Sequence, residues 1–551
     1  MCNKTFVSIA KQYYINSKTF QSGEIMSSVS ENKRSILRGS FGSAAATMLA
    51  RILGLLRVML EARVLGGNAL ASIWAWAFAI PNLFRRLLGE GALSQALIPM
   101  LSHTEAEKGI AEVRRQLALV LSALTVLLII ICIITSAISL LAGKFIATDY
   151  IREALKIVPL LMPYSIFICL VGVMTAVVNT RGVFFLASLN ALILNVVMIF
   201  LLYLADRLGG ASSQKTLYVL ISGVLTSGVL QAGLLAFLLK KYGIFPVFRK
   251  SERPAKSIFS ELWHLTLPGL IGGGAVQISF LIDRAIALSI GDYAVPALNY
   301  TERLVYLPVG IVAVALSSVL MANMSRAAAN KRYDEMLDDM ALGLRFVWFG
   351  CAPLAIFMIA YREPVIRVLF QYGRFTAENA AATADALFFY AMGIPAFCAV
   401  KVILPMFYAR KKMHTPLKIS LVCMALNVPL SIILMFPLKQ GGIALATVIS
   451  QLLNNTLLLY FLKRENFSPE WKGIVLTMTR SIIFALPAVF PAYWFGDIKN
   501  YVGDKFEIII LIACGLFAAV CYLAMQLAAK APEPREFISS LVSRKSRKKE
   551  K

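Results

Sequence analysis

Hydrophobic residues occur along this chain in runs of about 20, separated by short polar breaks. A helical run of this length is what crosses the hydrocarbon core of a bilayer, because each residue adds about 1.5 Å of rise. By this criterion the pattern predicts about fourteen membrane-spanning helices. Their expected limits are 40–64, 70–88, 117–142, 157–178, 184–204, 216–239, 259–289, 296–325, 343–360, 380–409, 416–436, 440–462, 473–496 and 506–528.

The composition supports an all-α polytopic membrane protein. Of 551 residues, 58% are hydrophobic and 15% are charged, whereas soluble domains average about 45–50% and about 25%. A soluble enzyme, a disordered chain and a fibrous protein are therefore excluded. The chain has no long polar insert and no P-loop pattern, so it does not carry its own ATPase domain. Chains of this kind are typically secondary transporters or flippases rather than enzymes.

Basic residues set the expected orientation. The net charge is +25, and the lysines and arginines gather in the loop near residues 240–256 and in the C-terminal tail. Because cytoplasmic loops of membrane proteins collect Lys and Arg, both termini are expected in the cytoplasm. The same rule explains the high charge without nucleic-acid binding, which we do not expect.

The basic loop lies near the middle of the first twelve spans, which suggests two six-helix lobes followed by a helix pair. Met26 begins a more natural start, so residues 1–25 are interpreted as either an over-extended start or a dispensable tail. The expected parts are a basic tail (1–38), an N-lobe (39–241), a basic linker (242–257), a C-lobe (258–463), a final helix pair (464–530) and a basic tail (531–551).

Several charges fall inside apolar runs, where one charge costs about 2.5–3.5 kcal/mol. The first span carries Arg51, Arg57 and Glu61, and the eighth carries Glu302 and Arg303. Arginines that face one cavity would bind an anion, because the guanidinium fork matches phosphate oxygens. The residues alone therefore predict a transporter for a substrate with phosphate or another strong anion.

Other charges and polar residues have simpler interpretations. Arg86, Arg284 and Asp385 are expected near the interface, where they snorkel or pair locally; Lys401 is a further charge within a span. Seven of the eight cysteines lie in apolar runs without metal-ligand spacing, and the three histidines are scattered. No metal site is expected.

Two consecutive segments carry a family resemblance: LARILGLLRVMLEARVLG, then AFAIPNLFRRLLGEGALSQALIPML. Together they resemble the N-terminal signature of the MurJ (MviN) lipid II flippases, of the multidrug/oligosaccharidyl-lipid/polysaccharide exporter superfamily. Two later blocks agree, one around LNYTERLVYLPVGI and one around FYARKKMHTPLKIS.

The resemblance implies fourteen helices in two lobes, with a lipid-facing groove formed by the last pair. It implies translocation of lipid II, an undecaprenyl-pyrophosphate-linked disaccharide-pentapeptide, to the outer leaflet of the cytoplasmic (inner) membrane for cell-wall synthesis. Membrane lipids and the cell-wall synthesis machinery are the further partners it suggests. The substrate-binding arginines of the family fall on Arg51, Arg57, Arg85 and Arg303, and its supporting residues on Asn82, Glu90 and Glu302.

The chain departs from the family pattern at several positions. Ser72, Val58 and Lys412 stand where acidic residues are usual. The acidic–Asn–acidic set that some members are proposed to use for sodium falls on Asp283, Asn427 and Ser431, so one carboxylate is missing. Asp283 and Asn427 are the candidate ion-coupling residues. No cofactor is expected, and coupling to the membrane potential, Na⁺ or H⁺ stays open.

Three alternatives remain at this stage. A flippase for another lipid-linked oligosaccharide would use the same arginines. A drug antiporter of the same superfamily would favour acidic and aromatic cavities. A non-transporting scaffold for cell-wall assembly would tolerate loss of the cavity charges.

Overall fold

The computed structural model describes residues 48–89, 92–146, 148–181, 183–207, 214–248, 255–495 and 506–535. These residues form helices joined by short turns. The expectations for the N-terminal tail (1–38) and for most of the C-terminal tail (531–551) lie outside them.

The first lobe contains six long helical segments and the beginning of a seventh. Its first helix covers residues 48–65. It is followed by α3 (Ala69–Phe84), η1 (Arg85–Gly89), α4 (Ala92–Phe145), α5 (Asp149–Asn179), α6 (Phe184–Arg207), α7 (Gln214–Lys241) and the start of α8 (Ala255–Ile290).

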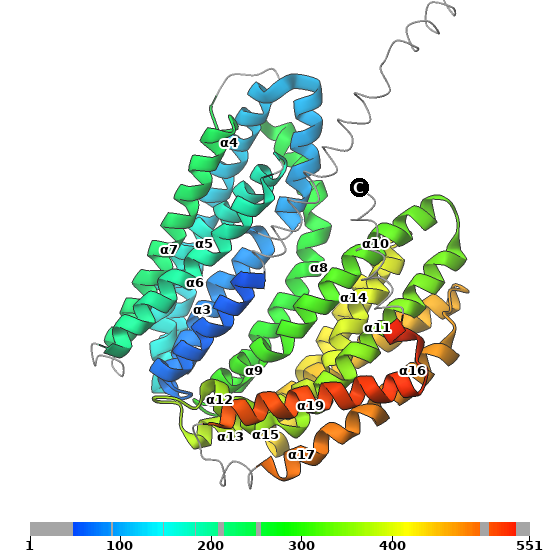
Figure 1. Cartoon of the computed structure of the whole chain (residues 1–551). Helices are drawn as coiled ribbons and strands as arrows, with labels where there is room; N and C mark the ends of the chain where they lie inside the picture. The colour runs from blue at the N-terminus through cyan, green and yellow to red at the C-terminus, as the bar shows by residue number, and fades with distance from the viewer. Residues whose placement is uncertain are drawn as a thin grey trace, which may run out of the picture.

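The second lobe continues from α8 and lies beside the first (Figure 1). Its elements are α9 (Ala294–Pro308), η2 (Val309–Ala313), α10 (Val314–Ala329), α11 (Tyr333–Ala360), α12 (Arg362–Phe370), α13 (Ala377–Met392), α14 (Ile394–Ala409) and α15 (His414–Arg464). The final helices are α16 (Trp471–Ala485), η3 (Leu486–Val489), α17 (Phe490–Tyr493) and α19 (Glu507–Ala528).

Each lobe has its own buried core, and α8 belongs to both. Near the start of α8, Ile258 and Leu262 pack into the first core. Near its end, Ala287 and Leu288 pack into the second. This one helix therefore connects the lobes through two separate sets of apolar contacts.

Two helices of more than 50 residues are each bent at one residue with a left-handed backbone. In α4 this residue is Gly109 (φ 76°), and in α15 it is Lys439 (φ 49°). Lys439 lies between the predicted spans 416–436 and 440–462, so α15 is two consecutive spans. The break predicted from the hydropathy pattern is confirmed there.

Two π-helical segments interrupt the predicted spans 70–88 and 296–325. Pro81 precedes η1 in α3, and Pro308 directly precedes η2. Proline lacks an N–H and removes a helical hydrogen bond, so a local change in helical winding behind it is expected. Insertions of this kind are frequent at functional sites.

The lobes are joined at one end by hydrogen bonds, here called the closed end. The Tyr300 hydroxyl donates to the Gly66 carbonyl at 2.9 Å, and the Arg374 N–H donates to the Arg63 carbonyl at 3.0 Å. The Ser72 hydroxyl donates to the Asp292 carbonyl. In Figure 1 the lobes diverge from this end towards the start of α8.

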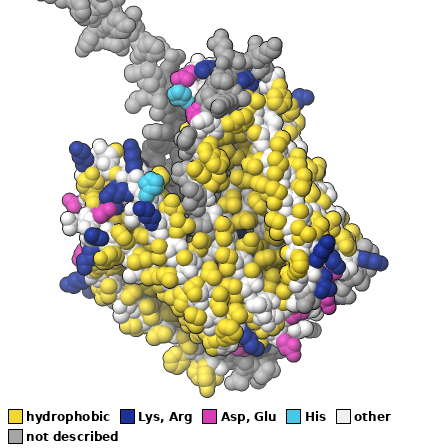
Figure 2. Space-filling model, turned by 180° about the vertical axis from the view of Figure 1, so that it is seen from behind, with side chains coloured by type: hydrophobic (Ala, Val, Ile, Leu, Met, Phe, Trp, Pro, Cys, Tyr) yellow, Lys and Arg dark blue, Asp and Glu magenta, His cyan; other side chains and the backbone are white. Residues whose placement is uncertain are grey.

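Among the described residues, nine helices are long and apolar enough to cross a membrane. Figure 2 shows one face of the molecule covered by hydrophobic side chains, with lysines and arginines towards its margins. A surface of this kind is stable against lipid rather than water. The expectation of an all-helical polytopic membrane protein is confirmed.

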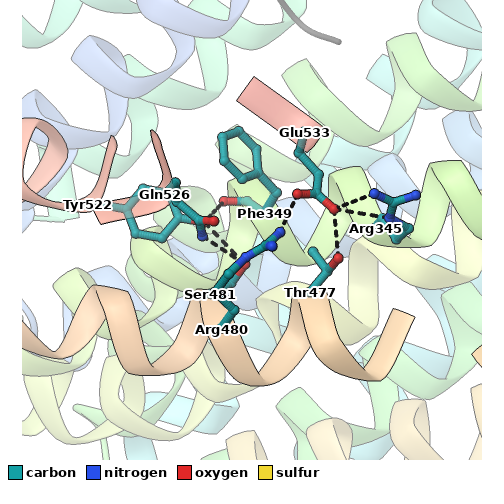
Figure 3. A network of polar contacts seen from close by, with 8 residues as sticks. All are labelled: Arg345, Phe349, Thr477, Arg480, Ser481, Tyr522, Gln526 and Glu533. Atoms are coloured by element: carbon teal, nitrogen blue, oxygen red, sulfur yellow. Dashed lines mark hydrogen bonds and ion pairs between the residues drawn. The ribbon is translucent and has the colours of Figure 1, made fainter. Parts of the chain in front are cut away.

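A buried carboxylate just beyond α19 links the final helix pair to α11. Glu533, just beyond α19, is fully buried and accepts hydrogen bonds from Arg345 of α11 at 2.8 and 3.0 Å. Thr477 of α16 donates to it at 2.7 Å, and Arg480 pairs with its other oxygen. Figure 3 shows these side chains converging between α11 and α16.

Candidate functional site

A cavity of about 950 Å³ lies between the two lobes. The first helix, α3, η1 and α6 line it from one side, and α8, α9, η2, α14 and α15 from the other. Both π-helical segments border it. Ligand cavities of helical bundles commonly occupy such a position between helices.

The wall of this cavity is strongly cationic. Among the described lining residues, seven are Lys or Arg and three are Asp or Glu. The cations are Arg51, Arg57, Arg85, Arg86, Arg284, Arg303 and Lys401, and the carboxylates are Glu61, Asp283 and Glu302. The surplus of positive charge makes the cavity suited to an anion.

Residues 50, 51, 54, 57 and 61 place one face of the first helix on the cavity, as spacings of three and four residues do on an α-helix. Arg57 pairs with Glu61 at 3.3 Å, and its guanidinium lies 6.0 Å from the Phe78 ring centre. Arg57 is thus held in place by a neighbour of opposite charge and by an aromatic face.

Arg51 reaches across to the second lobe. A Cβ atom at Gly310 of η2 would lie 1.5 Å from Arg51 Nη1, so the guanidinium occupies the space left by the missing side chain. No described residue forms an ion pair or hydrogen bond with the Arg51 side chain. Its donors therefore remain available to a ligand.

Arg303 of α9 faces the cavity from the second lobe, and its side chain is open to it. The neighbouring Glu302 does not neutralise it, since Glu302 pairs with Arg284 at 3.2 Å and accepts from the Tyr390 hydroxyl at 3.5 Å. Within the described part of the chain, no carboxylate pairs with Arg303. One cation from each lobe thus faces the same space without a counter-ion.

The polar residues that follow Pro81 in the family signature, Asn82, Arg85 and Arg86, are held by hydrogen bonds. The Asn82 amide donates to the Phe78 carbonyl at 2.9 Å and accepts from Arg85 Nε at 3.1 Å. Arg86 donates to Gln277 of α8 at 2.9 Å. Glu90 lies outside the described residues.

Arg86 and Arg284, expected near the interface with local pairing, both line the cavity. Arg284 does pair locally, with Glu302. Asp385 is exposed and is not among the lining residues. The hydropathy pattern could not separate these cases, because it does not report which face of a helix meets a cavity.

The candidate ion-coupling residues lie together. Asp283 Oδ1 accepts from the Asn427 amide at 2.8 Å and from the Ser431 hydroxyl at 3.2 Å, and Thr447 approaches Oδ2 at 3.5 Å. Ser450 donates to Asn427 at 3.1 Å. Three protein donors thus surround one buried carboxylate.

The departures from the family pattern have structural roles. Ser72 makes its hydrogen bond to Asp292 at the closed end, and Val58 is buried in the second core. Lys412 pairs with Glu465 at 2.9 Å. Each replacement thus has a partner or a packing site suited to its own chemistry.

Gly310, Lys401 and Asn454 are among the wall residues that were not recognised as site residues from the sequence. The sequence showed Lys401 as a charge within a span, but it did not show that the side chain faces the cavity. Gly310 and Asn454 carry no signal in an apolar run, because their importance comes from what the opposite helix places against them.

Comparisons with known proteins agree with this geometry. The family model described as "Lipid II flippase MurJ" matches residues 61–512. A relative from Rhizobium tropici, named probable lipid II flippase MurJ, is 32% identical over 508 residues, or 87% of this chain and 92% of the relative. A relative from Burkholderia cenocepacia, named lipid II flippase MurJ, is 26% identical and covers 87% and 94%.

Solved structures show the same fold. A lipid II flippase MurJ in an inward closed conformation superimposes with a TM-score of 0.71 at 23% identity, over 90% of this chain and 99% of that one. An inward-facing multidrug resistance transporter of the MATE family gives 0.63 at 12% identity, over 77% and 98%. With its matching family model and its multi-pass helical fold, the chain belongs to the lipid II flippase MurJ family of membrane transporters.

Proposed function

We propose that this protein carries lipid II from the inner to the outer leaflet of the cytoplasmic membrane. One observation carries the proposal: Arg51 and Arg303, from opposite lobes, face one cavity without a counter-ion among the described residues. A pyrophosphate offers oxygens to both guanidinium groups at once, which is the pairing that this side chain favours. The family to which the chain belongs supports the same substrate.

The orientation proposed for the molecule places both termini in the cytoplasm. Basic loops support it through the positive-inside rule. The first helix then runs outward, so that the closed end, at Gly66 and Tyr300, faces the outside. In this orientation the structure is an inward-facing state that admits a head group from the cytoplasm.

The transport step is alternating access. Cations of two lobes repel one another when the cavity is empty, and a bound dianion reverses the sign of that interaction. A substrate that contacts both lobes therefore favours a state in which they approach at the cytoplasmic end. The closed-end hydrogen bonds would open in that state and release the head group outside.

Resetting the carrier requires an energy source, for which Asp283 and Asn427 are the proposed coupling residues. Asp283 is the buried carboxylate of the polar cluster, and its protonation or its binding of Na⁺ would change the charge between α8 and α15. The membrane potential is a second source, worth about 2.3 kcal/mol per charge per 100 mV.

The polyprenyl chain would stay in lipid beside the final helix pair, and membrane lipids would occupy that surface between turnovers. The cell-wall synthesis machinery is the proposed recipient of the product. A flippase for another lipid-linked oligosaccharide is the second candidate, because the same arginines would serve it. The cationic wall disfavours a carrier of cationic drugs.

The test is complementation of a strain depleted of its own lipid II flippase, with externalised lipid II measured by a head-group-specific probe. We expect rescue by the wild-type chain and loss of rescue by Arg303→Ala at normal membrane abundance. The matched control is Arg326→Ala, an exposed arginine at the end of α10. Rescue by Arg303→Ala would remove the anion-site assignment, and a well-expressed wild-type chain that fails to externalise lipid II would favour the second candidate.

A further inference from the structure

Lys401 is a cation of the cavity that the arginine site does not account for. It lies on α14, and Phe397 and Leu404, about one turn to either side, also line the cavity. Its side chain is open to the cavity rather than packed away. An ammonium in this position needs an anion from elsewhere, because a charge within a membrane protein is costly without a partner.

Lys401 comes from a different helix than any of the lining arginines. The charged groups close to Arg303 are Arg57, Glu61, Arg86 and Arg284. Among described titratable groups, the neighbour of Lys401 is the thiol of Cys398, and no described carboxylate pairs with it. The cavity thus receives its guanidinium groups from the first helix, η1, α8 and α9, and its single ammonium from α14.

The part of the cavity wall that α15 supplies is largely polar and uncharged. It comes from both halves of α15, through Ser420, Ser450, Gln451 and Asn454. Asn455 donates to the Ala396 carbonyl at 2.9 Å, which holds this part of α15 against α14 shortly before Lys401. Hydroxyl and amide groups of this kind bind sugars and peptides by hydrogen bonds rather than by charge.

The side-chain amide oxygen of Asn454 has no hydrogen-bond donor among the described residues. The Asn454 side chain is only 8% exposed, and its Oδ1 accepts no hydrogen bond from the described residues. A buried acceptor that stays unsatisfied is destabilising. Because Asn454 lines the cavity, a ligand N–H group that reaches this oxygen by a small rotation of the side chain would satisfy it.

We propose that Lys401 and Asn454 form a second subsite, which holds the glycopeptide part of the substrate. The ammonium meets a peptide carboxylate, and the Asn454 oxygen accepts from a peptide N–H. A compact ammonium suits one carboxylate, whereas the planar guanidinium groups suit the several oxygens of a pyrophosphate. The subsite rests on the proposed function, since it presupposes a substrate with both chemistries.

The test compares two ligands on the full-length purified protein: the polyprenyl-pyrophosphate disaccharide with its pentapeptide, and the same lipid without the peptide. We expect Lys401→Met to weaken binding of the first by about tenfold or more, the scale of one charge-assisted hydrogen bond, and to leave binding of the second unchanged. Arg303→Ala should weaken both. Lys418→Met makes the same chemical change at an exposed lysine and should weaken neither.

Equal losses for the two lipids in Lys401→Met would place Lys401 in the pyrophosphate site and overturn the proposal, as would no loss for either. Asn454→Leu is a second variant with the same expected ligand preference, in case Lys401→Met melts at a lower temperature than wild type. If the wild-type protein binds neither lipid, the proposed function itself fails. That outcome differs from one in which the wild type binds both lipids and Lys401→Met binds them equally well, which overturns the subsite alone.

Discussion

At the scale of single residues, the site depends on which cations lack a partner inside the protein. Arg57 and Arg284 have carboxylates at 3.3 and 3.2 Å, whereas Arg51 and Arg303 have none among the described residues. Removing Arg57 would also leave Glu61 unpaired and buried, which is destabilising in its own right. Arg51 and Arg303 are therefore the positions where loss of function reports on the ligand rather than on folding.

Gly310 should be as important as the arginine that it accommodates. A methyl group there would overlap Arg51 Nη1, so Gly310→Ala should displace the guanidinium from the cavity. We expect at least a tenfold fall in externalised lipid II at normal membrane abundance, similar to Arg51→Ala. The assay is the complementation described above with its head-group probe.

The control is Gly350→Ala in α11, where the added methyl meets no atom within 4 Å. It should leave transport unchanged, since alanine favours helix by up to about 1 kcal/mol over glycine. Normal transport by Gly310→Ala would mean that the Arg51 side chain does not need its place against η2.

At the scale of helices, the hydropathy pattern predicted most spans, because burial in lipid demands apolar residues whatever the tertiary contacts. It did not predict η1 or η2. A π turn adds one residue to a helix without altering the apolar run, and only Pro81 and Pro308 signal it. The arginines were identified because a charge stands out in an apolar run, whereas Asn454 and Gly310 depend on contacts that only the folded chain shows.

The last helix pair offers a test at this scale. Burial alone would raise the pKa of Glu533, but hydrogen bonds from Thr477 and Arg345, with the charge of Arg480, hold it below its ordinary value. A carboxyl group with a lowered pKa stabilises the fold above its ordinary pKa of about 4.3, and this contribution disappears as the pH falls through the folded-state pKa.

Glu533→Gln should therefore lower the free energy of unfolding at pH 7 by about 3 kcal/mol, the scale for removing one member of a buried ion pair. The difference from wild type should shrink as the pH is lowered from 7 towards 3. Intrinsic tryptophan fluorescence during unfolding measures both. Glu335→Gln, in an exposed pair with Arg332, should change stability by less than about 1 kcal/mol; an equally small effect of Glu533→Gln would show that the buried network does not fasten the pair.

At the scale of the whole molecule, two lobes share one helix and meet at the closed end through hydrogen bonds and through apolar side chains such as Val58 and Ala62, which pack into the second core. This arrangement suits rigid-body motion, because each lobe can keep its own packing while the contacts between them change. The closed-end contacts use backbone carbonyls of Gly66, Asp292 and Arg63 as acceptors. Such contacts can break without leaving an unpaired charge behind.

Tyr300→Phe should loosen the closed end. The variant loses one hydrogen bond between the lobes, to the Gly66 carbonyl, and keeps the ring that stacks on Phe370 at 5.3 Å. One net hydrogen bond contributes about 1 kcal/mol, so the open population at this end should rise about fivefold. Hydrogen–deuterium exchange of residues 63–72 and 288–300 should become faster by the same factor.

The matched control is Tyr460→Phe, which removes a hydroxyl from an exposed tyrosine of α15 and should leave exchange at the closed end unchanged. Faster exchange confined to α9 would indicate local loosening of that helix. Faster exchange in both segments, 63–72 in the first lobe and 288–300 in the second, would indicate separation of the lobes. The two segments belong to different lobes and meet at the closed end, so they would loosen together when that contact opens. Unchanged exchange in both segments would mean that packing, not this hydrogen bond, keeps the end closed.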